Sequence, residues 1–281
     1  MRKFILSTAV GLVLSMGGAL PPAAQASDMV KPIDIKWSFE GIFGTFDRAA
    51  IKRGSQVFFE VCNGCHSMDL VAYRNLVEIG MDEQFVKDLA AEYEVADGPN
   101  DEGDMFTRPA RLSDRVVSPF ANEKAARFFN GGAYPPDLSV ITKARANGPD
   151  YIYSLLVGYQ DKAPEGFELA EGTSYNEYFP GHQIFMGRPI ADGSVEYEDG
   201  TSSTLDQLAK DVVVFLAWAA EPELEERKSM GVWVLAYLIV LTILLYLLKR
   251  RIWGRICLDE FTHDPYTEMY QEELDKHSLS D

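Results

Sequence analysis

The chain has 281 residues, with 26 basic against 43 acidic side chains and a formal net charge of −17 at pH 7. This acidity argues against nucleic acid or an anionic surface as the main partner, and it suits a basic protein partner. Apolar residues make up 47% of the chain, enough for a sizeable folded core.

Residues 1–26 have the pattern of a secretory signal peptide. Two cationic residues begin the chain, an apolar run covers residues 4–20, and Ala24-Gln25-Ala26 supplies a small-x-small cleavage site. We therefore predict an exported bacterial protein whose mature form begins near Ser27. A retained N-terminal anchor is the alternative.

The stretch from residue 27 to residue 229 reads as a helical domain, because apolar residues recur at helical spacing. Gly54 would allow a second helix to cross closely. Residues 159–203 have little helical pattern, and a loop of this length in a compact domain is usually functional. The predicted helices cover residues 47–65, 69–79, 82–93, 122–131, 137–146, 149–158 and 204–222.

Residues 230–248 form an apolar run without a charge. As a helix, the run would extend about 28 Å, close to the thickness of a bilayer's hydrocarbon core. Basic residues follow at 249–251, and such residues stay on the cytoplasmic side. We expect a transmembrane helix that leaves residues 27–229 in the periplasm and residues 249–281 as a short cytoplasmic tail.

Two of the three cysteines lie in the stretch EVCNGCHSM. Cys62 and Cys65 are exported, whereas Cys257 lies beyond the membrane span on the reducing side. A thioredoxin-like disulfide would need an α/β framework around the pair. A zinc site would need further ligands, and the exported part offers only His66 and His182.

The remaining interpretation of Cys-x-x-Cys-His is covalent haem attachment. Each thiol adds to a haem vinyl group, and the two intervening residues match the separation of the vinyls. His66 is then held beneath the ring and ligates the iron. We predict one haem c, bound through two thioether bonds at Cys62 and Cys65.

The sixth iron ligand separates an electron carrier from a protein that binds small molecules or peroxide. Met68 is too near His66 to reach the other face of the ring, and Met81 is better explained as a surface or core residue. Local spacing leaves three candidates open: Met105, Met186 and His182.

Residues 82–104 hold nine acidic residues and one basic residue. This stretch is either an ordinary solvated face or a docking surface for a basic partner.

Several stretches together resemble the cytochrome c1 family, whose members are the membrane-anchored haem subunits of quinol–cytochrome c oxidoreductase, the bc1 complex. The resemblance runs from about residue 37 to the end of the predicted span. It rests on RGSQVFFEVC, CHSMDLVAYR, DGPNDEGDMFTRPARLSD, GGAYPPDLSVITKAR, YIYSLLVGY, YNEYFPG and DVVVFLAWAAEPE.

The resemblance implies a specific haem environment. Met186, which follows the Tyr-Phe-Pro-Gly stretch, would be the axial ligand opposite His66. Arg145 would pair with a haem propionate, with Tyr151 nearby. Pro135 and Pro136 would line the pocket. His182 and Arg188 depart from the family pattern of the ligand loop, and the chain lacks the extra cysteine pair of some bacterial relatives.

The resemblance also implies fold and function. We expect an all-α, cytochrome c-like haem domain with long loops and one C-terminal transmembrane helix. The chain would act beside cytochrome b and the Rieske iron–sulfur protein in a dimeric bc1 complex. It would pass one electron from the Rieske protein to a c-type cytochrome. The alternatives are a c-type subunit of a terminal oxidase, a ligand-binding or peroxidase haem protein, and a structural scaffold.

Overall fold

The computed structural model describes residues 30–262, 269–270 and 272. The predicted signal peptide and most of residues 263–281 lie outside these. The chain divides into two compact units, Met1–Ser38 with Phe46–Pro222 and Phe39–Thr45 with Glu223–Asp281.

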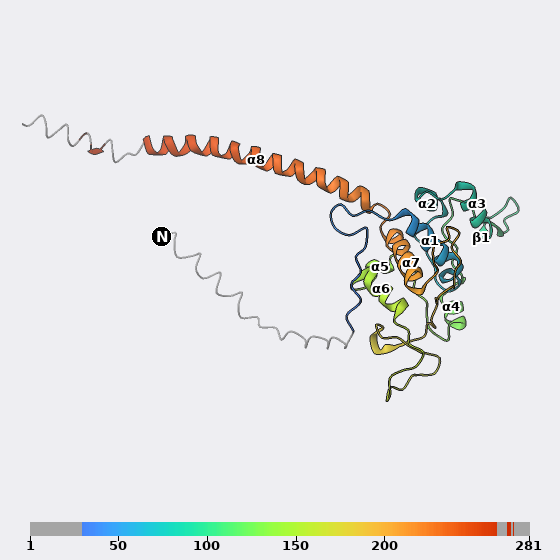
Figure 1. Ribbon diagram of the computed structural model, residues 1–281. Coiled ribbons are helices and arrows are strands. Elements are labelled where there is room, and N and C mark those ends of the chain that lie inside the picture. Colours follow the sequence, from blue (N-terminus) through green and yellow to red (C-terminus); the bar gives the residue numbers. More distant parts are fainter. Residues whose placement is uncertain (1–29, 263–268, 271, 273–281) are drawn as a thin grey trace, which may run out of the picture. The chain divides into compact units, whose positions relative to one another are not determined.

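The first unit is predominantly helical, which confirms the predicted all-α class (Figure 1). Its strands form two short antiparallel hairpins, β1 (Glu94–Asp97) with β2 (Phe106–Pro109) and β3 (Ser174–Tyr175) with β4 (Gln183–Ile184). Its helices are α1 (Arg48–Glu60), α2 (Tyr73–Glu78), α3 (Glu83–Ala91), α4 (Glu123–Phe129), α5 (Ile141–Ala144), α6 (Gly148–Val157) and α7 (Leu205–Ala220), with 3-10 turns η1 (Cys62–Gly64) and η2 (Pro180–His182).

Several helices begin where a polar side chain can accept from the free N–H groups of the first turn. Asn122 accepts from the N–H of Ala125 at 3.0 Å, and Thr204 accepts from the N–H of Gln207 at 3.2 Å. Asp47 caps α1 in the same way. These local signals explain why the predicted starts of α4 and α7 are confirmed.

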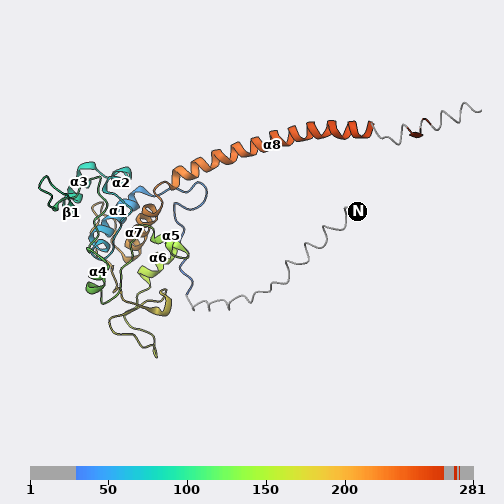
Figure 2. The ribbon, with the colours of Figure 1, turned by 180° about the vertical axis from the view of Figure 1, so that it is seen from behind.

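The core of the first unit is the crossing of α1 and α7, which lie side by side in both views (Figures 1 and 2). Gly54 lies at the contact. A Cβ added there would lie 2.0 Å from the carbonyl oxygen of Asp211 and 2.8 Å from Cβ of Phe215. The ring of Phe58 packs 5.5 Å from that of Phe215. The predicted close crossing at Gly54 is therefore confirmed.

An ion pair beside this crossing ties the long loop to the helices. Asp211 is 1% exposed and accepts from Nε and Nη2 of Arg53 at 2.8 and 3.0 Å. Arg53 also pairs with Asp199 of the loop at 3.0 Å. The hydrogen bonds that Arg53 donates to the Asp211 carboxylate outweigh the effect of burial and raise the pKa of Arg53. Removing Arg53 would leave the buried Asp211 carboxylate without this partner, which would be strongly destabilising.

The prediction of a helix over residues 137–146 is wrong in its first half. The helix, α5, is confined to Ile141–Ala144 because the carboxylate of Asp137 accepts hydrogen bonds from other partners, which are described below. Similarly, α2 begins at Tyr73 rather than residue 69. The β1–β2 hairpin was not predicted at all.

The second unit contains α8 (Leu224–Thr262), and the predicted span 230–248 lies inside it. Within Leu224–Gly254, an 18-residue window reaches a mean hydropathy of 2.5, and among the described residues this is the one helix long and apolar enough to cross a membrane. Most apolar side chains of residues 230–248 are exposed, as expected of a helix with lipid as its solvent.

Candidate functional site

The Cys-x-x-Cys-His motif lies on a tight turn at the end of α1. The carbonyl oxygen of Cys62 accepts from the N–H groups of both Cys65 and His66, at 3.1 and 2.9 Å. Both cysteines are free thiols in the structure. Burial, and secondarily the neighbouring Cys65, raises the pKa of Cys62 to about 12, so this thiol is neutral at pH 7. One turn thus presents two free thiols and an imidazole.

The imidazole of His66 is fixed in one orientation. Its Nδ1 lies 2.8 Å from the carbonyl oxygen of Pro136. Because a carbonyl can only accept, Nδ1 carries the proton and the lone pair of Nε2 is left for a metal. Burial lowers the pKa of His66, although the hydrogen bond to the backbone of Pro136 and the charge of Asp137 both act to raise it. A neutral imidazole of defined tautomer is what metal ligation requires.

Asp137 holds the segment that carries this carbonyl. One carboxylate oxygen accepts from the hydroxyl of Ser67 and the N–H of Asp69, both at 2.8 Å, and the other accepts from the N–H of Ser139 at 2.9 Å. Burial would raise the pKa of Asp137, but these hydrogen bonds together hold it below its usual range. Asp137 therefore clamps the Pro136 segment beside the motif, a role that the predicted helix over residues 137–146 did not reveal.

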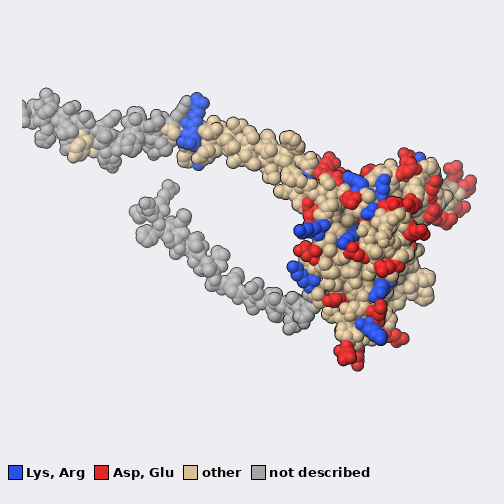
Figure 3. Space-filling model, in the orientation of Figure 1, with Lys and Arg blue, Asp and Glu red and all other residues tan. Residues whose placement is uncertain are grey.

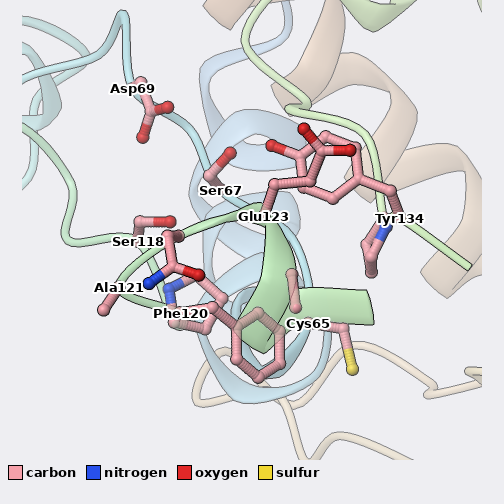
Figure 4. Close-up of a pocket in the computed structure, with 12 residues that line it drawn as sticks. Cys65, Ser67, Asp69, Ser118, Phe120, Ala121, Glu123 and Tyr134 are labelled. Atoms are coloured by element: carbon pink, nitrogen blue, oxygen red, sulfur yellow. The ribbon is translucent and has the colours of Figure 1, made fainter. Parts of the chain in front are cut away.

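A pocket of about 260 Å³ adjoins Cys65 (Figure 4). Pro135 lines it, so the structure places this predicted residue next to the motif. The sulfur of Cys65 points away from Asp69 and Ser67 (Figure 4). Because neither His66 nor Met186 lines the pocket, it is a border of the candidate site rather than the whole of it. The lining residues are Cys65, Ser67, Asp69, Ser118, Pro119, Phe120, Ala121, Asn122, Glu123, Ala126, Tyr134 and Pro135.

Met186 lies just after β4, with its backbone fixed by Tyr159. The hydroxyl of Tyr159 donates to the carbonyl oxygen of Met186 at 3.0 Å. Arg188 in turn donates to the carbonyl oxygen of Tyr159 at 2.8 Å and pairs with Asp161 at 3.0 Å. The segment after β4 is therefore held against the chain that follows α6. Arg188, which departs from the family pattern of the ligand loop, therefore helps to position the segment that contains Met186.

Arg145 and Tyr151 are brought together. Burial raises the pKa of Tyr151, and the charge of Arg145 opposes that rise. Burial, with Tyr151 nearby, also raises the pKa of Tyr159. Arg145 and Tyr151 therefore influence each other electrostatically, as do Tyr151 and Tyr159, whose hydroxyl donates to the carbonyl oxygen of Met186. These predicted residues belong to one neighbourhood.

The other two ligand candidates lie in different surroundings. Met105 is 67% exposed beside the first residue of β2. The ring of His182 stacks on that of Tyr175, with centroids 5.7 Å apart, and its edge meets Phe167. This aromatic cluster accounts for His182 as a packed residue of the β3–β4 hairpin.

The donor set fits haem better than a metal ion held by protein alone. Over residues 30–262 and the few described beyond, no group of three or more His, Cys, Asp or Glu side chains could hold a metal. A single oriented imidazole beside two free thiols matches an iron whose remaining ligands come from a porphyrin.

Comparison with known sequences agrees with this arrangement. The model of the cytochrome C1 family matches residues 37–256. The chain belongs to the cytochrome c1 family. Cytochrome c1 of Rhodospirillum rubrum is 51% identical over 261 residues, covering 87% of this chain and 94% of the relative. Two further relatives come from Arabidopsis thaliana and Candida albicans. The Arabidopsis thaliana protein named "Cytochrome c1 1, heme protein, mitochondrial" is 56% identical over 74% of this chain and 68% of its own. The Candida albicans protein named "Cytochrome b-c1 complex catalytic subunit, mitochondrial" is 50% identical over 83% of this chain and 81% of its own.

Proposed function

We propose that this chain is the electron-transfer subunit of a bc1 complex, passing one electron from the Rieske iron–sulfur protein through a covalently bound haem c to a c-type cytochrome. The observation that carries the proposal is the His66–Pro136 hydrogen bond directly after two free thiols on one turn. The names of the relatives support it, because they are called haem proteins and a subunit of the cytochrome b-c1 complex.

In this proposal the thiols of Cys62 and Cys65 would hold the haem covalently, and Nε2 of His66 would ligate its iron. The sulfur of Met186 would be the second protein ligand of the iron. Haem supplies a one-electron couple when it is bound. A thioether raises the potential of that couple relative to a second imidazole, which suits a step downhill from a Rieske cluster.

The surrounding residues orient the group and limit water access. Pro135 and Pro136 would border the haem beside His66, where the carbonyl oxygen of Pro136 accepts from Nδ1 of the imidazole. Tyr159 and Arg188 keep the Met186 segment in place through the bonds described above. Arg145 is exposed and supplies a fixed positive charge for a propionate, with Tyr151 beside it.

The acidic stretch supplies a surface for the acceptor. Residues 82–104 form α3, β1 and the turn that leads to β2, and most of their acidic side chains are exposed. Figure 3 shows acidic side chains crowded over this part of the first unit. A negative surface of this kind speeds encounter with a basic cytochrome, and salt weakens its effect.

In the membrane, α8 anchors the chain beside cytochrome b and the Rieske protein in a dimeric complex. The basic residues 249–251 stay in the cytoplasm, so the haem domain faces the periplasm.

The test compares Met186→Leu with the matched variant Met105→Leu in the purified complex. We expect Met186→Leu to keep its haem, to lower the reduction potential and to stop quinol-driven reduction of the c-type cytochrome. Met105→Leu should behave as wild type. A native potential in Met186→Leu would contradict the ligand assignment. Fast carbon monoxide binding by the reduced wild type would instead support a ligand-binding haem protein, and co-purification with a copper–haem oxidase would support a terminal oxidase subunit.

A further inference from the structure

A short loop, Phe39–Thr45, is fastened to the first turns of α8. The ammonium of Lys228 donates to the carbonyl oxygens of Phe39 and Gly44, at 2.6 and 3.1 Å. The loop and α8 belong to the same compact unit. Because one side chain of the helix holds both ends of the loop, the position of the loop along α8 is set by Lys228.

The loop is a tight turn rather than a slack connection. A Cβ added to Gly44 would lie 1.8 Å from the carbonyl oxygen of Glu40, so only glycine fits there. Gly41 has φ +69°, in the left-handed region that favours glycine. These two glycines bracket Ile42 and Phe43 and project them from the turn.

Both projected side chains are large, apolar and open to the surroundings. Ile42 is 69% exposed and Phe43 is 83% exposed, the largest fraction among the large apolar side chains that the structure describes outside any masked segment. The tip from Gly41 to Gly44 carries no charge. Contiguous exposed apolar side chains are typical of surfaces that bind a protein or a membrane.

The position of Lys228 places this tip near a membrane surface. Lys228 lies two residues before the uncharged run of α8. At the helical rise per residue, this separation is about 3 Å along the helix axis. Charged residues dominate the turn before it, and the 74% exposed Trp233 lies five residues after it. Tryptophan favours the boundary between headgroups and hydrocarbon, and lysine at such a boundary reaches toward polar groups.

We propose that Ile42 and Phe43 insert into the lipid bilayer at the end of α8 nearest Lys228, giving the chain a second point of contact with the membrane. Lipid is favoured over a protein partner because the tip is tied to the helix that itself enters lipid. Two adjacent apolar side chains on a glycine-bounded turn form a wedge rather than a groove. The inference depends on α8 crossing a membrane and does not depend on haem.

The test uses the full chain in phosphatidylcholine nanodiscs with Cys257→Ser as the parent. A nitroxide is attached at Phe43→Cys or at the matched control Phe128→Cys, whose native side chain is 81% exposed on α4 of the other unit. Collisions with oxygen, which concentrates in lipid, are compared with collisions with a water-soluble nickel chelate. The unaltered parent reports any labelling of Cys62 and Cys65, so a failure of haem attachment is seen separately.

We expect oxygen to dominate at position 43 and the nickel chelate to dominate at position 128. Nickel dominating at both positions would overturn the proposal, since the tip would then lie in water. Protection of position 43 from both reagents would also overturn it, in favour of a covering protein. Adding Lys228→Met should raise the nickel collisions at position 43, and an unchanged ratio would refute the role of Lys228.

Discussion

Replacing Asp137 by asparagine tests the clamp that holds Pro136 against His66. The carboxylate accepts three hydrogen bonds, two at one oxygen and one at the other. Asparagine keeps one acceptor oxygen, so at best it retains the bonds from Ser67 and Asp69. Its amide N–H₂ group then faces the N–H of Ser139, and two donors cannot bond each other.

The size of the effect follows from these bonds. A hydrogen bond to a charged group contributes about 1.5–3 kcal/mol and a neutral one about 1 kcal/mol. One charged bond is lost and two are weakened, while partial exposure of Asp137 reduces the total. We expect the first unit to lose about 2 kcal/mol, or about 4–8 °C in its thermal midpoint.

The assay is thermal and denaturant unfolding of the full chain, followed by circular dichroism, with Asp101→Asn as the control for charge alone. Asp101 is exposed, so its substitution should change stability by less than about 0.5 kcal/mol. Because the folded pKa of Asp137 is depressed, its contribution is present above the unfolded value of about 3.9 and is lost as pH falls through the folded value. The difference between wild type and Asp137→Asn should therefore shrink below about pH 4. Equal stability of Asp137→Asn and Asp101→Asn at pH 7 would refute the clamp.

Two further substitutions test the crossing and the ligand segment. Gly54→Ala should destabilise the first unit by about 1–3 kcal/mol, although alanine normally stabilises a helix, because its Cβ would overlap the Asp211 carbonyl. Gly231→Ala, with no atom within 4 Å, is the control, and a stabilised Gly54→Ala variant would contradict the close packing. Tyr159→Phe removes the hydroxyl that holds the Met186 backbone and should speed carbon monoxide binding to the reduced protein. Tyr153→Phe, which loses a bond to Asp206 instead, should not; equal rates in the two variants would exclude that role for Tyr159.

Much of the helical frame follows from local sequence. Asn122 and Thr204 cap helices because their side chains accept hydrogen bonds, and Gly54 lets two helices approach closely because it has no Cβ. Each of these effects follows from the residue itself. The Cys-x-x-Cys-His turn is also a local structure, because the carbonyl oxygen of Cys62 accepts from the N–H groups of Cys65 and His66 at its end.

Other features depend on contacts between distant segments, which spacing does not reveal. Asp137 begins a predicted helix, yet its partners Ser67 and Asp69 lie about seventy residues earlier in the chain. The choice among the candidate sulfur and imidazole ligands could not be made from spacing, because Tyr159, Tyr175 and Phe167 distinguish their surroundings only after folding. The β1–β2 hairpin was not predicted because charged residues, which have a low propensity for strands, interrupt its sequence.

The central claim is that both thiols of the motif carry haem. The most direct measurement is mass spectrometry of the denatured, alkylated and digested protein, focused on the peptide that contains Cys62, Cys65 and His66. The account predicts that this peptide bears the mass of one haem and that neither cysteine is alkylated. An unmodified peptide with both cysteines alkylated would contradict it.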